Sequence, residues 1–184
     1  FFANELMQKM VITGKKAEIE TIINKMPSTP IPNYAYKNNA NLTFSNQAQN
    51  WGLDTPSFSN GAAYGDLDND GDLDLVVNNV NMEAFVYKNN AEKNKQNHFV
   101  KVKLKGDQQN KFAVGSTVEL FSGSEILRQE LIPSRGFQSS IDYTMTFGIG
   151  NKKIDSLQVI WPNGKTQTIK KVTNNTTIKL NILD

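Results

Sequence analysis

The sequence contains no cysteine, a single histidine and no long hydrophobic run. Without cysteine the chain can form no disulfide, hold no thiolate zinc site and use no cysteine nucleophile. No stretch approaches the roughly 18 to 20 consecutive apolar residues that a membrane-spanning helix needs, and no signal-peptide core is in view. With 184 residues, 38% of them hydrophobic, the chain is expected to be water-soluble and globular, with room for one medium domain or a small domain and part of another.

Arginine is scarce as well, since only Arg128 and Arg135 stand among the 20 basic residues. The lysines are spread along the chain and form no block, which is typical of a solvated surface and does not predict nucleic-acid binding. The formal net charge of +2 hides one concentration of charge, because five of the 18 acidic residues fall between Asp66 and Asp74. Without those five charges the chain would carry +7.

Asparagine is abundant, with 23 residues, and several stand in pairs such as Asn38-Asn39. Asparagine tolerates left-handed backbone and forms Asx turns, so residues 33–44 predict two short strands about an asparagine-rich turn. After residue 97 apolar and polar residues alternate cleanly, as where Val100, Val102 and Leu104 alternate with three lysines. Such alternation predicts about seven half-buried antiparallel strands in a small β-sandwich or barrel.

The N-terminal residues follow a different pattern. Apolar residues recur at helical spacing over residues 2–10 and again over residues 19–26, with Gly14 between them. These two segments predict a short helical hairpin. The proline-rich segment that follows at residues 27–32 (PSTPIP) predicts an extended connection, because proline and the residue before it disfavour helix.

One short string occurs twice. Tyr-Lys-Asn-Asn stands at residues 36–39 and again at residues 87–90, which is 51 residues later. A period of about 40 to 50 residues built from four short strands is typical of a β-propeller blade. The repeat therefore favours a propeller-type blade in the first half of the chain.

The segment GDLDNDGDLDL holds the main candidate site, with aspartate at every second position and Gly71 at the sixth position of the loop. Calcium takes six to eight oxygen ligands, and a loop of this spacing offers carboxylates at its positions 1, 3, 5 and 9 and a carbonyl at position 7. The glycine permits the sharp turn. We therefore predict a calcium site in which Asp66, Asp68, Asp70 and Asp74 bind through their side chains and Asp72 binds through its main-chain carbonyl.

An EF-hand, a magnesium site and a plain solvated turn fit the acidic segment less well. An EF-hand needs a bidentate glutamate at its twelfth position, which here is Val77, and needs a following helix where this chain has strand formers. Magnesium prefers fewer carboxylates and keeps its waters. A plain solvated turn stays open, because aspartate, asparagine and glycine are common in turns. Against it, five carboxylates within nine residues repel one another, and no lysine or arginine lies between Asp66 and Asp74 to offset them.

Residues 61–79 (GAAYGDLDNDGDLDLVVNN) resemble the FG-GAP or VCBS repeat, the calcium-loop blade of integrin-type β-propellers. The C-terminal part resembles the ASPIC/UnbV domain. That resemblance depends on four strings: AVG at 113–115, SRGFQS at 134–139, FGIG at 147–150 and VIWPNG at 159–164. The combination is similar to that of cartilage acidic protein and many bacterial surface proteins, in which such a domain follows the blades.

With this resemblance, the sequence predicts a mainly β fold, in which a propeller-type blade packs with a C-terminal antiparallel β-sandwich after a short N-terminal helical hairpin. The predicted parts are a helical lead-in with its proline-rich connection at residues 1–32, an FG-GAP/VCBS-type calcium-loop blade at 33–96 and an ASPIC/UnbV-like β-sandwich at 97–184. A propeller closes only with several blades. We therefore expect this chain to be a piece of a longer protein, monomeric by itself.

The resemblance implies a non-enzymatic calcium-binding interaction or adhesion module of a cell-surface or secreted protein, with calcium in a structural role and a protein or a glycan as partner. Extracellular calcium modules often bind at about 10⁻⁴ to 10⁻³ M and would empty in a cytosol, which favours an external location, outer-membrane-associated or periplasmic in a bacterium. Two alternatives stay open: the accessory, glycan-binding end of a surface enzyme that acts on polysaccharide, and an enzyme with calcium at its active site.

Two further features suggest no catalytic residue. His98, the only histidine, begins a strand and is expected at a strand edge, because the sequence assigns it neither a nucleophile nor an orienting acid. Tyr34, Tyr36 and Trp51 offer an aromatic surface that could stack on a sugar near the acidic segment.

Overall fold

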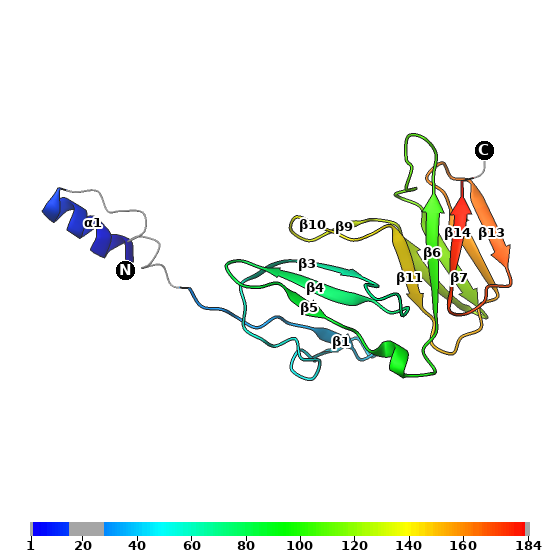
Figure 1. Ribbon diagram of the computed structural model, residues 1–184, viewed down its shortest axis with the longest axis horizontal. Helices are drawn as coiled ribbons and strands as arrows, with labels where there is room; N and C mark the ends of the chain where they lie inside the picture. The colour runs from blue at the N-terminus through cyan, green and yellow to red at the C-terminus, as the bar shows by residue number, and fades with distance from the viewer. Residues whose placement is uncertain (1, 15–27, 183–184) are drawn as a thin grey trace. The chain divides into compact units, whose positions relative to one another are not determined.

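The computed structural model describes residues 2–14 and 28–182 and shows a mainly β protein, which confirms the coarse fold class (Figure 1). The chain forms two compact units, residues 1–58 and 59–184. The described strands make several separate sheets and no closed barrel. In the described segments, no helix has the length and hydropathy to cross a bilayer. The propeller and sandwich forms and the domain boundaries after residues 32 and 96 stay predictions.

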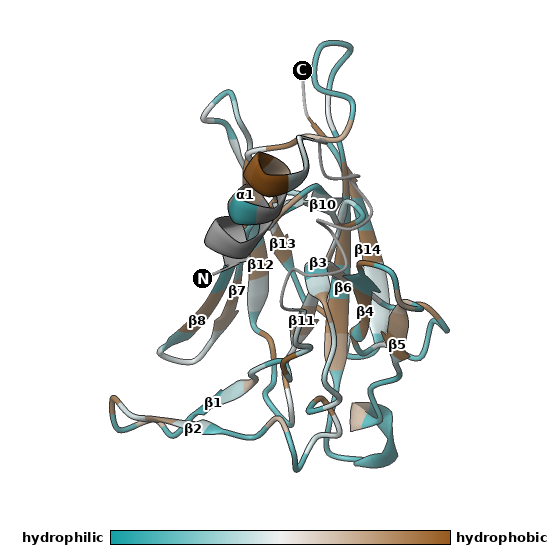
Figure 2. Ribbon diagram, turned by 90° about the vertical axis from the view of Figure 1, so that its left-hand side faces the viewer, coloured by the Kyte–Doolittle hydropathy of each residue, from teal (hydrophilic) through white to brown (hydrophobic). Residues whose placement is uncertain are grey.

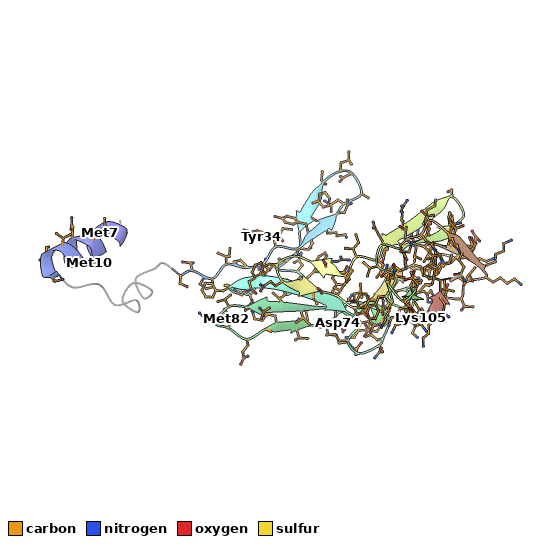
Figure 3. All side chains as sticks on the ribbon, turned by 90° about the horizontal axis from the view of Figure 1, so that it is seen from above. Met7, Met10, Tyr34, Asp74, Met82 and Lys105 are labelled. Atoms are coloured by element: carbon orange, nitrogen blue, oxygen red, sulfur yellow. The ribbon has the colours of Figure 1, made fainter. Side chains whose placement is uncertain are left out.

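The first unit begins with one helix, α1 (Phe2–Thr13). The helix ends because Gly14 adopts left-handed backbone, with φ +63°, and its N–H donates to the Met10 carbonyl oxygen at 2.9 Å. Met7 and Met10 are exposed on this helix (Figure 3). The helix α1 covers the first half of the predicted hairpin. The second half, residues 19–26, lies outside the described residues, so the hairpin as a whole stays a prediction.

A two-stranded antiparallel sheet follows in the same unit, made of β1 (Tyr36–Asn38) and β2 (Phe44–Asn46). The turn between them uses left-handed backbone at Ala40 and Leu42, with φ of 61° and 64°. The Asn38 side-chain oxygen accepts a hydrogen bond from the Ala40 N–H at 2.9 Å, which is an Asx turn. The two short strands about an asparagine-rich turn are therefore confirmed.

The second unit begins with a three-stranded antiparallel sheet in the order β3-β4-β5. Its strands are β3 (Ser59–Gly65), β4 (Asp74–Asn79) and β5 (Phe85–Tyr87). Gly65 at the end of β3 pairs with Asp74 at the start of β4. We call residues 66–74, which join these strands, the acidic loop. Because its two ends are paired strand positions, the sheet register fixes where the loop begins and ends.

Two further sheets, of three and four strands, lie C-terminal to this one (Figure 1). The first, in the order β11-β6-β14, consists of β6 (Phe99–Lys105), β11 (Thr144–Gly148) and β14 (Thr176–Asn181). The second, in the order β13-β12-β7-β8, consists of β7 (Thr117–Ser122), β8 (Glu125–Glu130), β12 (Ser156–Ile160) and β13 (Thr166–Lys170). The strand β14 runs parallel to β6, which corrects the expectation of purely antiparallel strands. These two strands are far apart in the sequence, so the chain can cross to the other sheet and return in the same direction.

One hydrophobic cluster includes buried residues from both of these sheets, as two sheets packed face to face would produce. Its members include Val100, Val102, Met145 and Phe147 from one sheet and Val118, Leu120, Leu157 and Val159 from the other. In Figure 2 hydrophobic residues colour these strands, whereas most connecting loops are hydrophilic. The predicted alternation is confirmed on β6, except that Lys101, which alternates with its buried valines, is buried as well.

A short hairpin joins the β3-β4-β5 sheet to the rest of the second unit. Its strands β9 (Ser134–Arg135) and β10 (Ser139–Ser140) begin within the SRGFQS segment, and the hairpin contacts β3 (Figure 1). The Arg135 Nε donates to the Tyr64 hydroxyl at 2.9 Å. A Cβ on Gly61 would lie only 3.0 Å from the Phe137 carbonyl oxygen and 2.7 Å from Ser139 Oγ. The hairpin therefore approaches β3 at a distance that glycine alone permits.

Replacing Gly61 by alanine is expected to destabilise the protein by about 1–3 kcal/mol, because the new methyl group overlaps the backbone of the hairpin. The matched control is Gly65→Ala in the same strand, where a Cβ meets no described atom within 4 Å apart from its chain neighbours. Thermal unfolding of the two variants and the wild type measures the difference. Equal melting temperatures for Gly61→Ala and Gly65→Ala would contradict the close approach.

Candidate metal centre

The acidic loop folds through its own aspartates. The Asp70 N–H donates to Asp68 Oδ1 at 3.3 Å, and the Asp72 N–H donates to Asp70 Oδ1 at 3.2 Å. Each is an Asx-type bond from a carboxylate to the amide two residues later. The Gly71 N–H closes the loop by donating to Asp66 Oδ2 at 2.9 Å. The alternation of aspartates therefore determines the loop conformation and turns three carboxylates toward a common side.

Three of the predicted ligands are close enough together to hold one ion. Asp66, Asp68 and Asp70 each offer a carboxylate oxygen, and these oxygens lie within 4.8 Å of one another. The Asp66 side chain is only 7% exposed, and its Oδ1 is buried with no hydrogen-bond partner among the described residues. Buried carboxylate oxygens of this kind are rare unless a cation or a donor satisfies them. The donor set of hard oxygens therefore fits calcium.

Asp74 has a different surrounding from the other aspartates of the loop. It is 3% exposed, and its Oδ2 accepts the Leu67 N–H at 3.0 Å while its Oδ1 accepts the Asn89 N–H at 2.9 Å. Figure 3 shows Asp74 where β4 begins. These bonds connect the start of β4 to Leu67 near the start of the loop and to Asn89 after β5. The role of Asp74 as a metal ligand stays a prediction, and its observed role is to hold the loop closed.

A second group of carboxylates includes a residue that the sequence did not indicate. Asp70, Asp72 and Glu92 offer oxygens within 4.8 Å of one another. Glu92 lies in the 3-10 helix η1 (Ala91–Lys93), and its N–H donates to Asp72 Oδ2 at 3.2 Å. Within the described segments, Asp72 Oδ1 and Glu92 Oε2 are buried without hydrogen-bond partners. Only the fold brings Glu92 to the loop, because no spacing in the sequence relates it to the aspartates.

Two lysines from other elements approach the acidic loop. The Lys101 ammonium on β6 pairs with Asp66 Oδ2, and the Lys88 ammonium after β5 pairs with Asp68 Oδ2 and lies 3.2 Å from Asp70 Oδ2. No basic residue lies within residues 66–74, but the fold supplies these two cations from 14 and 27 positions beyond Asp74. The expected repulsion among the aspartates is therefore partly offset by cations from outside the acidic segment, which the spacing within residues 66–74 did not indicate.

These contacts shift the pKa values of Asp68 and Lys88 in opposite directions. The hydrogen bond from Lys88 is the largest effect on Asp68 and lowers the pKa of its carboxyl below 3.8. The same contacts with Asp68 and Asp70 raise the pKa of Lys88 above its usual 10.5. Asp72 behaves differently, because partial burial raises the pKa of its carboxyl more than the N–H of Glu92 lowers it.

The acidic loop contacts β6 directly. Gly71 has φ +104°, and a Cβ at this position would lie 1.9 Å from Cε1 of the Phe99 ring. The Lys101 ammonium lies 5.3 Å from the centre of the same ring. Glycine at the sixth loop position is therefore needed for the turn and also for contact with the neighbouring strand.

A cavity of about 700 Å³ lies beside the loop. Its wall includes Asp70, Asp72, Glu92, His98, Phe99 and Asn175. The side chain of Asn175 lies 3.1 Å from His98 Nδ1, and its oxygen accepts the Phe99 N–H at 3.2 Å. The expectation of a strand-edge histidine agrees with this position just before β6.

The predicted aromatic surface belongs to the first unit. The rings of Tyr34 and Tyr36 stack with centroids 6.1 Å apart, and both side chains are exposed. Trp51 is exposed as well. A sugar-binding role for these rings near the acidic loop stays a prediction.

Comparison with known protein families agrees with the resemblance drawn from the sequence. Residues 24–77 match the family model of the FG-GAP-like repeat, and residues 106–183 match that of ASPIC and UnbV. The acidic loop lies in the first matched segment, and the SRGFQS, FGIG and VIWPNG strings lie in the second. The chain therefore contains an FG-GAP-like repeat followed by an ASPIC and UnbV domain, as predicted. No curated protein matches the chain.

This combination indicates an extracellular-type adhesion or accessory module, because both matched segments are repeat or accessory modules and FG-GAP repeats are typical of extracellular proteins.

Asp72→Asn is expected to raise the melting temperature of the chelator-treated protein at pH 7. The pKa of Asp72 is higher in the folded state than its ordinary value of 3.8, so ionising this carboxyl opposes folding. That cost is present above the folded-state pKa and disappears as pH falls through it toward pH 3.8. The stabilisation by Asp72→Asn should therefore be largest near neutral pH and vanish below about pH 4.

Asp68→Asn is the matched control of opposite sign. Its pKa is lowered in the folded state, so the wild-type carboxylate stabilises the protein above pH 3.8 and loses this effect as pH falls through the folded-state pKa. Melting curves of both variants between pH 3 and pH 7 measure the two effects. An Asp72→Asn variant that is less stable than the wild type at pH 7 would show that burial does not dominate at this position.

Proposed function

We propose that this chain is a non-enzymatic, calcium-binding interaction or adhesion module of a cell-surface or secreted protein, in which calcium has a structural role. The observation that carries this proposal is the group formed by Asp66, Asp68 and Asp70, with one buried Asp66 oxygen that no described residue satisfies. The match of this segment to the FG-GAP-like repeat supports it.

The residues that would hold calcium are all oxygen donors. Asp66, Asp68 and Asp70 offer carboxylates, and the proposed set is completed by the Asp72 carbonyl and the Asp74 side chain. Calcium accepts six to eight such ligands in flexible geometry, whereas magnesium requires a near-ideal octahedron and keeps several waters. A crowded set of carboxylates on one short loop therefore favours calcium over magnesium.

The position of the loop supports the proposed structural role of calcium. Asp66 contacts Lys101, and Gly71 contacts Phe99, so the loop is the junction between the β3-β4-β5 sheet and β6. When bound, calcium supplies positive charge that reduces the repulsion among the carboxylates. The ion would then stabilise the conformation in which the loop contacts β6, and so hold the β3-β4-β5 sheet against the sheet that contains β6.

An external location is part of the proposal. Extracellular calcium modules often bind at about 10⁻⁴ to 10⁻³ M, a range that fills outside cells and empties in a cytosol. In a bacterium this corresponds to the outer membrane surface or the periplasm. The proposed partner is a protein or a glycan and not nucleic acid, because the basic residues form no block in the sequence.

One alternative has a specific observation in its favour. The exposed, stacked rings of Tyr34 and Tyr36 would suit stacking on sugar rings, which favours the accessory, glycan-binding end of a surface enzyme that acts on polysaccharide. In that case this chain binds glycan and the catalytic residues lie elsewhere in the parent protein.

Calcium titration from a chelated sample to about 10 mM is expected to raise the melting temperature. A site that binds only the folded state adds RT ln(1 + [L]/Kd), about 2.7 kcal/mol at a hundred times Kd. For a protein of this size that corresponds to a rise of roughly 5–10 °C. Magnesium at the same concentration should produce a much smaller rise. No shift with calcium would reduce the acidic loop to a solvated turn.

The control is the double variant Asp68→Asn and Asp70→Asn, which removes two of the three clustered carboxylates. It should fold and lose the calcium-dependent rise, because its loop has lost two charged ligands. Both proteins are then assayed for turnover of polysaccharides, which tests the alternative of an enzyme with calcium at its active site. Turnover in the wild type that disappears in a variant of equal stability would identify an enzyme with catalytic calcium and contradict the structural role.

A further inference from the structure

The position of Lys88 at the acidic loop is fixed by the sheet. Tyr87 pairs with Leu75 at the end of β5, and the Asn89 N–H donates to Asp74 Oδ1 at 2.9 Å. Lys88 lies between these two anchored residues, so its backbone is held beside the loop. Its ammonium contacts Asp68 Oδ2 and lies 3.2 Å from Asp70 Oδ2.

Those two carboxylates belong to the group of three that is proposed to hold calcium. An ammonium that pairs with Asp68 and Asp70 uses their negative charge and occupies oxygens that a metal ion would need. A calcium ion bound among the same carboxylates would also lie close to the ammonium, and like charges at short range repel. The two cations are therefore competitors for one set of ligands.

The second lysine at the loop does not compete in this way. Lys101 pairs with Oδ2 of Asp66, whereas Oδ1 of the same carboxylate has no described hydrogen-bond partner and stays available to an ion. The Lys101 side chain is only 10% exposed and is held in place, while the Lys88 side chain is 52% exposed and can move into solvent. Lys101 is thus compatible with an ion in the loop, and Lys88 must move away from it.

We propose that Lys88 is a tethered cation that competes with calcium for Asp68 and Asp70, and so sets the calcium concentration at which the loop fills. The inference rests on the proposed calcium site and goes beyond it by assigning the residue that tunes its affinity. The competition makes the wild-type loop weaker than its five carboxylates alone would be. Such a device suits a site that must respond near millimolar calcium.

The test is isothermal titration of calcium chloride into the chelator-treated chain and two variants. Lys88→Met keeps the apolar stem of the side chain, removes the ammonium, and is expected to tighten calcium binding about tenfold. Lys103→Met is the matched control, since Lys103 lies on β6 beside Lys101 and makes no ion pair in the described part of the chain. Its calcium Kd should stay within about twofold of the wild type, which shows that general charge removal is not the cause.

Lysine acetylation read by mass spectrometry provides a second measurement on the unmutated protein. Calcium should increase the acetylation rate of Lys88 several-fold, because displacement from Asp68 and Asp70 frees the ammonium, while Lys101 stays protected. A wild type that binds calcium with the same Kd as Lys88→Met, or whose Lys88 labelling does not respond to calcium, would overturn this inference alone. Failure of both proteins to bind calcium would overturn the proposed function and this inference together.

Discussion

The buried ion pair between Lys101 and Asp66 is the interaction on which the position of the acidic loop depends. Both side chains are at least nine-tenths buried, so water solvates neither charge well, and Asp66 depends on Lys101 and on the Gly71 N–H. Removing one partner of such a pair costs about 3–5 kcal/mol, because the remaining charge is left buried and unpaired. The loop therefore cannot separate from β6 without exposing this ion pair to solvent or leaving one buried charge unpaired. The pair thus constrains where the other loop residues lie. The Gly71 contact with Phe99 adds a steric constraint at the same junction.

Because of this constraint, the loop has largely one conformation before any ion is considered. Asp74 closes its base through two backbone N–H groups, and Asx-type bonds shape its interior. Prior organisation of this kind lowers the conformational entropy lost on binding, which favours affinity. Repulsion among the carboxylates and competition from Lys88 act in the opposite direction. We expect a calcium site with both features to bind less tightly than a cytosolic calcium buffer and more tightly than a disordered acidic segment.

Sequence reasoning predicted the local features well and the long-range ones poorly. The alternation on β6, the turn at Ala40 and the acidic loop follow from periodicity and turn chemistry, which involve residues only a few positions apart. The ion pairs of Lys88 and Lys101, the approach of Glu92 and the parallel pairing of β14 with β6 join residues far apart in the sequence. No composition or spacing rule indicates which lysine among many will reach a given carboxylate. The buried position of Lys101 is the clearest case, since its strand pattern matches that of the exposed Lys103.

The charge balance of the junction explains why one further divalent ion is a reasonable complement. The loop carries five carboxylates and Glu92 adds a sixth beside it, while the two lysines that reach the loop supply two positive charges, so four negative charges remain uncompensated nearby. A monovalent cation would leave most of that excess, whereas a divalent one halves it even with both lysines present. If the divalent ion displaces the Lys88 ammonium, the net charge at the loop becomes more positive by one instead of two. The free energy of ion binding is then the difference between two states, one in which Lys88 pairs with the aspartates and one in which the divalent ion does. The affinity therefore depends on Lys88 as directly as on the ligands themselves.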